Sequence, residues 1–213
     1  MDQTNKKDPA VSYKFRRQDH AKLDKCAVPN GPVRDFADCA WLFHPGTARS
    51  WYTIRMGFRE AAMIYRYARD GIVAEIGRCV GGSTIVLATA ARRVLSVDRC
   101  PADDAALTRA LKKMGIHEGV ELVVADSQTY KPATASFDFI FIDGEHTLEG
   151  VSRDYKTWLP ALRSGGYMAF HDMVPFKENA SQGVAEFRKR VLDKDRHVKF
   201  AEEADTTRVY RKL

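Results

Sequence analysis

The stretch "GIVAEIGRCVGGSTIVLATAARRVLSVD", residues 71–98, decides the fold class. A short apolar run over residues 71–77 predicts a buried strand, and the glycines that follow predict a tight turn. "STIVLATAARRV" predicts a helix with Ser83 or Thr84 near its start, and "VLSVD" predicts a second strand. Strands that read as continuous apolar runs and alternate with helices indicate a parallel sheet covered on both faces.

The same alternation continues to the C-terminus. Further strands are expected at "VELVVAD", "FDFIFID" and "GGYMAFHD", with helices over "PADDAALTRALKKMG", from Leu148 to about Pro160, and over "SQGVAEFRKRVLDK". A leading helix ends near Gly71, and "VKFAEEADTTRVYRKL" predicts a closing antiparallel pair. We therefore expect a Rossmann-like, doubly wound α/β fold over residues 36–213, preceded by a flexible N-terminal arm or lid over residues 1–35.

Composition excludes several classes of protein. With 213 residues, of which 45% are hydrophobic, the chain can bury a full core. No apolar run approaches the roughly 20 residues that span a bilayer, and the polar N-terminus lacks a secretory signal, so we expect a cytoplasmic protein without membrane contact. Four cysteines without CxxC spacing predict free thiols. The net charge of +6 comes from basic residues interleaved with acids, which does not favour a nucleic-acid partner.

Acidic residues end the expected strands. In open α/β sheets, ligands bind outside the carboxyl ends of the strands, where the strand order reverses. The residues at these ends are Glu75 with Gly77, Asp98, Asp126, Asp143, and His171 with Asp172. A single acid there is usually a turn or capping residue, but five on one edge indicate a binding site.

The first turn distinguishes between cofactors. A dinucleotide fingerprint aligned from Gly77 places Cys79 where the second glycine should allow close approach of a pyrophosphate. This argues against NAD and favours an adenosine ligand without phosphates. Asp98 lies 21 positions after Gly77, which suits an acid that accepts both ribose hydroxyls. Asp126, followed by Ser127, is placed either to accept a hydrogen bond from an adenine amino group or to form an Asx-turn.

Four segments together carry a family resemblance. "VAEIGRCVGGST", "SVD", "VVADS" and "FDFIFIDGEHTLEGVSRDYKTWLPALRSGGYMAFHD" resemble the class I S-adenosylmethionine-dependent methyltransferases, in the branch of macrocin-type sugar O-methyltransferases and cephalosporin-hydroxylase-like proteins. The resemblance covers about residues 70–175 and implies a seven-stranded sheet with an antiparallel last strand. It implies that Glu75, Gly77 and Gly81 shape the methionine pocket, that Asp98 holds the ribose, and that Asp126 holds the adenine. Ser83, Ser127 and Asp143 are assigned to the same cofactor site.

The resemblance also implies a divalent metal. Sugar- and phenol-methylating members use an acid after the fourth strand and an acidic pair after the fifth, which here correspond to Asp143 and to His171 with Asp172. The carboxylates suit Mg²⁺ or Mn²⁺. His171 stands where the sugar enzymes carry an acid, and it either favours manganese, iron or zinc as a ligand or lies outside the set of metal ligands. Metal-free transfer is the alternative, because proximity alone accelerates a reaction with a sulfonium.

Glu145 and His146 are the candidates for the catalytic base. Glu145 matches an acid in the sugar-methylating relatives, and His146 has an ordinary pKa near 6.5, which suits proton abstraction. His146 has the alternative of a capping or packing role beside Thr147.

The expected function is O-methylation of a small hydroxylated acceptor, such as a sugar or a glycosylated metabolite, by a monomer or a homo-oligomer. A nucleic-acid methyltransferase is disfavoured because "IDGEH" stands where that class commonly carries an Asn/Asp-Pro-Pro-aromatic segment. A dehydrogenase is disfavoured by Cys79. A non-catalytic S-adenosylmethionine-binding protein and a hydroxylase-like activity are further alternatives.

Overall fold

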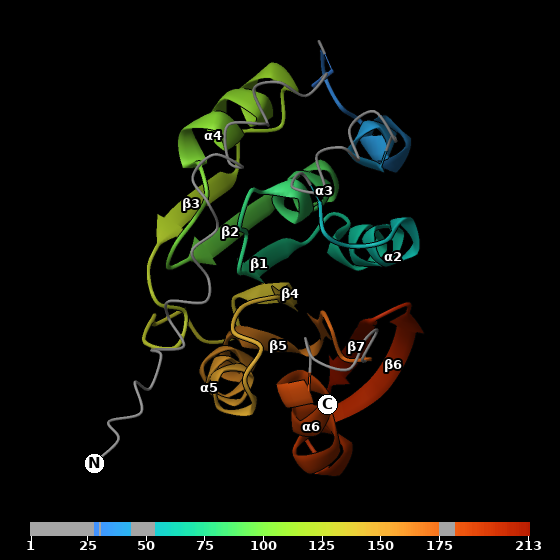
Figure 1. Cartoon of the computed structure of the whole chain (residues 1–213), viewed down its shortest axis with the longest axis vertical. Coiled ribbons are helices and arrows are strands. Elements are labelled where there is room, and N and C mark those ends of the chain that lie inside the picture. Colours follow the sequence, from blue (N-terminus) through green and yellow to red (C-terminus); the bar gives the residue numbers. More distant parts are fainter. Residues whose placement is uncertain (1–27, 30, 44–53, 175–181) are drawn as a thin grey trace, which may run out of the picture.

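A computed structural model describes residues 28–29, 31–43, 54–174 and 182–213. A single seven-stranded sheet runs through these residues in the order β3-β2-β1-β4-β5-β7-β6 (Figure 1). The strands are β1 (Ile72–Ile76), β2 (Arg93–Asp98), β3 (Val120–Val124), β4 (Phe137–Ile142), β5 (Leu162–Phe170), β6 (Val198–Ala204) and β7 (Thr207–Lys212). The first five strands are parallel to one another, and β7 is antiparallel to both β5 and β6. The predicted doubly wound α/β fold is confirmed.

Helices cover both faces of the sheet. One face packs against α2 (Phe58–Ala68), α3 (Gly82–Ala90), α4 (Asp104–Lys113) and the 3-10 helix η4 (Phe36–Phe43), and the other packs against α5 (Leu148–Trp158) and α6 (Gln182–Arg190). Successive side chains of a buried strand point to opposite faces of the sheet, so each strand contributes to both cores. Phe139 and Phe141 of β4 belong to the first core, whereas Ile140 and Ile142 belong to the second.

The packed chain begins before the expected boundary at residue 36. Val28 and Val33 are buried in the first core, and the Val33 N–H donates to the carbonyl of Met114. Residues 31–35 are therefore not a free arm. Residues 1–27 of the expected arm lie outside the described residues.

The strand order reverses between β1 and β4, which places a topological switch point at the centre of the sheet. From β1 the chain proceeds through β2 to β3 on one side, and from β4 it proceeds to β5 on the other (Figure 1). None of the helices within the described ranges combines the length and apolar character that crossing a bilayer would require.

Candidate active site

The residues after β1, β4 and β5 continue the strand ladder and therefore lie side by side. The Asp143 N–H donates to the Ile76 carbonyl at 2.8 Å, and the His171 N–H donates to the Ile142 carbonyl at 3.1 Å. Gly77 lies next to this edge with φ +85°, and a Cβ on it would lie 2.1 Å from the Asp143 carbonyl oxygen. Glycine is therefore required at position 77 by both conformation and space.

Asp98 holds the loop after β1. Its Oδ2 accepts the backbone N–H groups of Arg78 and Cys79, each at 2.9 Å, and its Oδ1 accepts the N–H of Cys100 at 2.7 Å. Cys79 adopts φ +49°, a left-handed conformation that is uncommon for a residue with a side chain. The acid expected to hold a ribose thus also fixes the turn that would lie beside it.

Glu75 and Ser83 bond to each other instead of facing a pocket. The Glu75 side chain is fully buried and accepts hydrogen bonds from the hydroxyls of Ser83, Thr84 and Ser96, the last two at 2.6 Å. The roles expected for Glu75 and Ser83 in the methionine pocket stay predictions, and the structure shows that both side chains have partners within the fold. The hydrogen bonds from Ser83, Thr84 and Ser96 to Glu75 join the start of α3 to β1 and β2. Through these bonds the Glu75 carboxylate can shape the expected methionine pocket without facing it.

Gly81 precedes the first residue of α3 and adopts φ +92°. A Cβ at this position would lie 2.5 Å from both methyl carbons of Leu107. The end of the loop after β1 can therefore lie against Leu107 of α4 because Gly81 lacks a side chain, whereas Gly77 lies against the backbone of Asp143 and Gly144.

Arg78 lies beside the candidate site and was not anticipated from the sequence. Its guanidinium is fully buried, pairs with the Asp104 carboxylate through Nε and Nη2, and donates through Nη1 to the carbonyls of Ser96 and Val123 at 2.9 Å each. One side chain therefore joins the first loop to β2, β3 and α4. A lone arginine after a strand has no sequence signal for burial.

The turn after β3 is held by Asp126. Its Oδ1 accepts the Gln128 N–H at 2.9 Å, which is the Asx-turn named above as the alternative to adenine binding. Ser127 donates to Oδ1 of Asp154 on α5 at 2.6 Å. The side chain of Asp126 is exposed beside this turn, so a further hydrogen bond to a ligand is sterically open.

Asp154 is a second residue that sequence reasoning missed. It is fully buried, and its Oδ2 has no hydrogen-bond partner among the described residues. Burial raises its pKa to about 6, aided by the charges of Asp126 and Glu145 and opposed by the Ser127 hydrogen bond. Its spacing of three from Val151 and four from Trp158, both buried, is a signal in the sequence that this acid faces the core.

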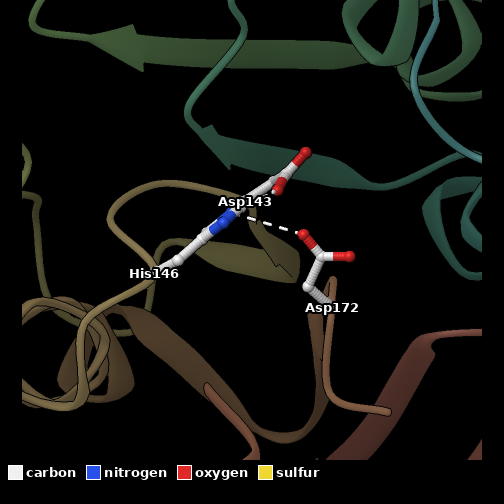
Figure 2. Close-up of side chains that lie close together, drawn as sticks. All are labelled: Asp143, His146 and Asp172. Carbon is white, nitrogen blue, oxygen red and sulfur yellow. Dashed lines mark hydrogen bonds and ion pairs between the residues drawn. The ribbon is translucent and has the colours of Figure 1, made fainter. Parts of the chain in front are cut away.

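Asp143, His146 and Asp172 form the acid–histidine cluster beyond β4 and β5 (Figure 2). His146 Nε2 lies 3.4 Å from Asp143 Oδ1 and 3.6 Å from Asp172 Oδ2. Figure 2 shows the His146 ring and the Asp172 carboxylate directed toward one another. Asp172 has φ +57°, a strained conformation that aspartate tolerates better than most residues.

His171 lies beside the cluster and contacts the same carboxylates. Its Nδ1 lies 3.2 Å from Asp143 Oδ1 and 3.6 Å from Asp172 Oδ2, and its other nitrogen, Nε2, lies 3.7 Å from Glu60 Oε1. Glu60 comes from the first turn of α2, and sequence reasoning missed it. The only sequence signal is its place three residues after Gly57, which indicates a capping role rather than a site.

The acids and imidazoles of the cluster shift each other's pKa values. Burial alone would raise the pKa of Asp143, but His171 and His146 hold it well below its ordinary value. Burial alone would lower the pKa of both histidines, but Asp143 and Asp172 raise it, and Glu60 adds to this effect at His171. The imidazoles therefore retain protons that a cation would displace.

Glu145 points away from the cluster. Its carboxylate accepts hydrogen bonds from Gln128 Nε2 at 3.0 Å and from the Thr147 hydroxyl at 2.8 Å. Thr147 is the N-cap of α5, because its hydroxyl oxygen accepts the Gly150 N–H. The capping role considered for His146 is therefore filled by its neighbour.

The donor set of the cluster fits a divalent cation. Two carboxylates suit Mg²⁺ or Mn²⁺, and imidazole nitrogen directed at the same carboxylates favours a transition metal such as Mn²⁺, Fe²⁺ or Zn²⁺. The Asp98 carboxylate and the exposed Asp126 likewise provide acceptors for the hydroxyl and amino donors of an adenosine group.

Comparison with known proteins supports a methyltransferase. Residues 74–173 match the model of a methyltransferase domain. The fold matches the S-adenosylhomocysteine-bound methyltransferase of Podospora anserina with a TM-score of 0.66 and 18% identity, covering 89% of this chain and 93% of that one.

Two further solved structures share the fold but differ in the activity that their names state. One is an S-adenosylmethionine-dependent O-methyltransferase of Thermotoga maritima (TM-score 0.54, 17% identity, 72% and 64% coverage). The other is a tRNA (m1A58) methyltransferase of Aquifex aeolicus (TM-score 0.56, 14% identity, 74% and 70% coverage). Identities this low establish the fold without selecting an acceptor. The domain match therefore identifies a methyltransferase domain over residues 74–173, and the solved structures share its fold.

Proposed function

We propose that the chain is a divalent-metal-assisted O-methyltransferase that acts on a hydroxyl of a small molecule, with a sugar or glycosylated metabolite as the first class to test. The observation that carries this proposal is the convergence of two carboxylates and two imidazole nitrogens at the ends of β4 and β5, beside the loop after β1. A metal-assisted transfer needs metal ligands next to the cofactor site, and this edge supplies carboxylate oxygens and imidazole nitrogens.

In this proposal, the β1–β3 side of the sheet edge binds the cofactor. Asp98 accepts the ribose hydroxyls while it holds the loop, and Asp126 accepts the adenine amino group. S-adenosylmethionine supplies an activated methyl group, and a divalent cation lowers the pKa of a hydroxyl that it binds.

Asp143, Asp172 and Nδ1 of His171 are the proposed metal ligands. His171 is buried and contacted on both nitrogens, so its ring is fixed, which suits a ligand. His146 lies on the loop after β4 and is about a quarter exposed, so its Nε2 can reach a substrate. We therefore assign proton abstraction to His146, because the Glu145 carboxylate is turned toward Gln128 and Thr147.

In the proposed methyl transfer, the sulfonium releases the methyl group and His146 accepts the proton of the acceptor hydroxyl. The acceptor oxygen forms a bond to the methyl carbon as the sulfur–carbon bond breaks, and His146 Nε2 takes the hydroxyl proton. Asp143 lies within 3.4 Å of the same nitrogen and stabilises the imidazolium that results.

The proposal predicts that Asp143→Asn and Asp172→Asn each weaken Mn²⁺ binding by at least about 100-fold, because a charged ligand is lost from a small donor set. Titration calorimetry with Mn²⁺, and separately with S-adenosylmethionine and NAD, measures this. Full turnover in the presence of a chelator would refute the metal, and failure to bind S-adenosylmethionine would refute the cofactor assignment.

His146→Gln separates a base from a ligand. If His146 is the base, the substitution should lower kcat by about 100-fold or more, while the affinity for Mn²⁺ changes little. Loss of Mn²⁺ binding would instead make His146 a ligand, and Glu145→Gln is the matched control, with a small expected effect on both. Release of S-adenosylhomocysteine is measured with polyhydroxylated acceptors and with tRNA. Methylation of RNA, with salt-sensitive retention, would favour a nucleic-acid acceptor instead.

A further inference from the structure

Glu60 links α2 to the proposed metal site. We propose that Glu60 is a positioning residue: its carboxylate faces Nε2 of His171 and favours the proton on that nitrogen, which leaves the Nδ1 lone pair free for a cation held by Asp143 and Asp172. This inference rests on the metal of the proposed function. It concerns a residue outside the segment that matches the methyltransferase-domain model.

The Glu60 carboxylate is held rigidly as a hydrogen-bond acceptor. Its Oε2 accepts the Gly57 N–H at 2.7 Å. Its Oε1 accepts the Thr206 N–H at 2.9 Å, the Thr206 hydroxyl at 2.6 Å and the Thr207 hydroxyl at 3.0 Å. The side chain is almost fully buried, so little water competes for it. All four contacts are donors to Glu60, which means that the remaining neighbour, His171, should also face it with a donor.

The two nitrogens of His171 face different environments. Nε2 lies 3.7 Å from Glu60 Oε1, and Nδ1 lies 3.2 Å from Asp143 Oδ1. A neutral imidazole has one N–H, and its position is decided by the hydrogen bond that the ring can make. With a cation between Nδ1 and the two aspartates, the proton of the neutral ring can only be on Nε2, the nitrogen that faces the Glu60 carboxylate. Histidine ligands in proteins are commonly oriented by a carboxylate in this way.

The contact between Glu60 and His171 connects α2 and the C-terminal hairpin, β6 and β7, to the proposed metal site. Glu60 is held by the N-terminal turn of α2, by Thr206 in the turn between β6 and β7, and by Thr207 at the start of β7. The C-terminal hairpin thereby supports a ligand at the end of β5, although no residue of that hairpin belongs to the cluster.

The tautomer of His171 can be measured in the unmodified protein. Zn²⁺ is diamagnetic, so the imidazole nitrogens of ¹⁵N-histidine-labelled protein can be observed by NMR with Zn²⁺ bound, and His171→Asn assigns the signals. We expect the proton on Nε2 and the metal on Nδ1. Metal on Nε2, or a proton on Nδ1, would overturn the proposal.

A double-mutant cycle tests whether Glu60 acts through His171. Glu60→Gln should weaken Mn²⁺ binding, measured by electron paramagnetic resonance without S-adenosylmethionine, by about 10- to 100-fold. In the His171→Asn background the same change should cause no further loss. Equal losses in both backgrounds, or no loss in the wild-type background, would contradict the proposal.

Glu202→Gln is the matched control. Glu202 also joins α2 to the C-terminal hairpin, through Arg66 and Tyr67, but it does not contact His171. Its substitution should leave Mn²⁺ affinity unchanged. A wild-type protein that binds no Mn²⁺ or Zn²⁺ would refute the metal in the proposed function and this inference with it. A wild-type protein that binds Mn²⁺ as tightly as Glu60→Gln does would refute this inference alone.

Discussion

The two halves of the sheet edge carry similar acids with different partners. Glu75 and Asp98, at the ends of β1 and β2, accept hydrogen bonds from hydroxyls and backbone N–H groups. Asp143 and Asp172, after β4 and β5, face imidazoles instead. Hydroxyl and N–H donors are permanent parts of the fold, whereas an imidazole can exchange its proton for a metal.

This difference shows how strand-end acids divide their roles. In the first half, an acid satisfied by the chain itself stabilises a loop that a cofactor can lie against. In the second half, two acids share two titratable rings, and their arrangement is suited to binding a cation or moving a proton. The partners of an acid, more than its place at a strand end, therefore decide whether it has a structural or a chemical role.

The largest expected effect tests the first half of the edge, at β1 and β2, where acids and Arg78 have structural partners. Arg78→Met should lower the free energy of unfolding by about 3–5 kcal/mol, because it leaves Asp104 and two carbonyls without their buried donor. Urea denaturation measures this. Arg153→Met, which removes only an exposed pair with Glu149, should cost less than about 0.5 kcal/mol. Equal losses of unfolding free energy for both variants would show that the buried hydrogen bonds of Arg78 stabilise the fold no more than an exposed ion pair does.

The next effect tests the second half of the edge, after β4 and β5, where acids face imidazoles. Because their acidic neighbours raise the pKa values of His146 and His171, both rings carry protons at mildly acidic pH. A cation must displace a proton from each ring that it binds. Mn²⁺ affinity should therefore rise with pH from 6 to 8, by about tenfold per unit for each displaced proton. Calorimetry in buffers of different ionisation enthalpy counts those protons, and a pH-independent affinity would contradict the comparison.

The smallest effect concerns Asp154, which lies between the two halves and has one satisfied oxygen. Its pKa of about 6 in the folded protein is above its ordinary value, so the folded state binds more protons than the unfolded state between about pH 4 and 6. Stability contributed by this group therefore falls as pH rises through that window, and the penalty remains above pH 6.

Asp154→Asn removes that penalty and keeps an acceptor for the Ser127 hydroxyl. It should stabilise the protein at pH 8 by about 1–2 kcal/mol and have little effect at pH 4. Thermal unfolding at both pH values measures the difference. Asp70→Asn is the control, since Asp70 is largely exposed and asparagine tolerates its left-handed conformation. A destabilised Asp154→Asn protein at pH 8 would mean that the ionised acid has an undetected donor.

Much of the site could be read from the sequence because parallel strands bring their carboxyl ends to one edge. Gly77, Asp98, Asp143 and Asp172 lie on that edge as expected. The partners of Glu75 could not be predicted, since alternation along a strand does not reveal that Ser83, Thr84 and Ser96 converge on one carboxylate. Glu60 could not be inferred, because it lies more than 100 residues from His171 in the chain and reaches it only through packing.

Local pattern by itself determined the α/β fold, the order of its elements and the edge that carries the candidate site, because apolar runs, glycines and strand-end acids act over a few neighbouring residues. Tertiary structure alone decided which acids are satisfied by the chain and which remain available. It placed His146 and His171 between Asp143 and Asp172, and it placed Glu60 behind His171. These pairings join α2, β4, β5 and the C-terminal hairpin. Such contacts depend on how separate elements pack, which no local pattern in the sequence encodes.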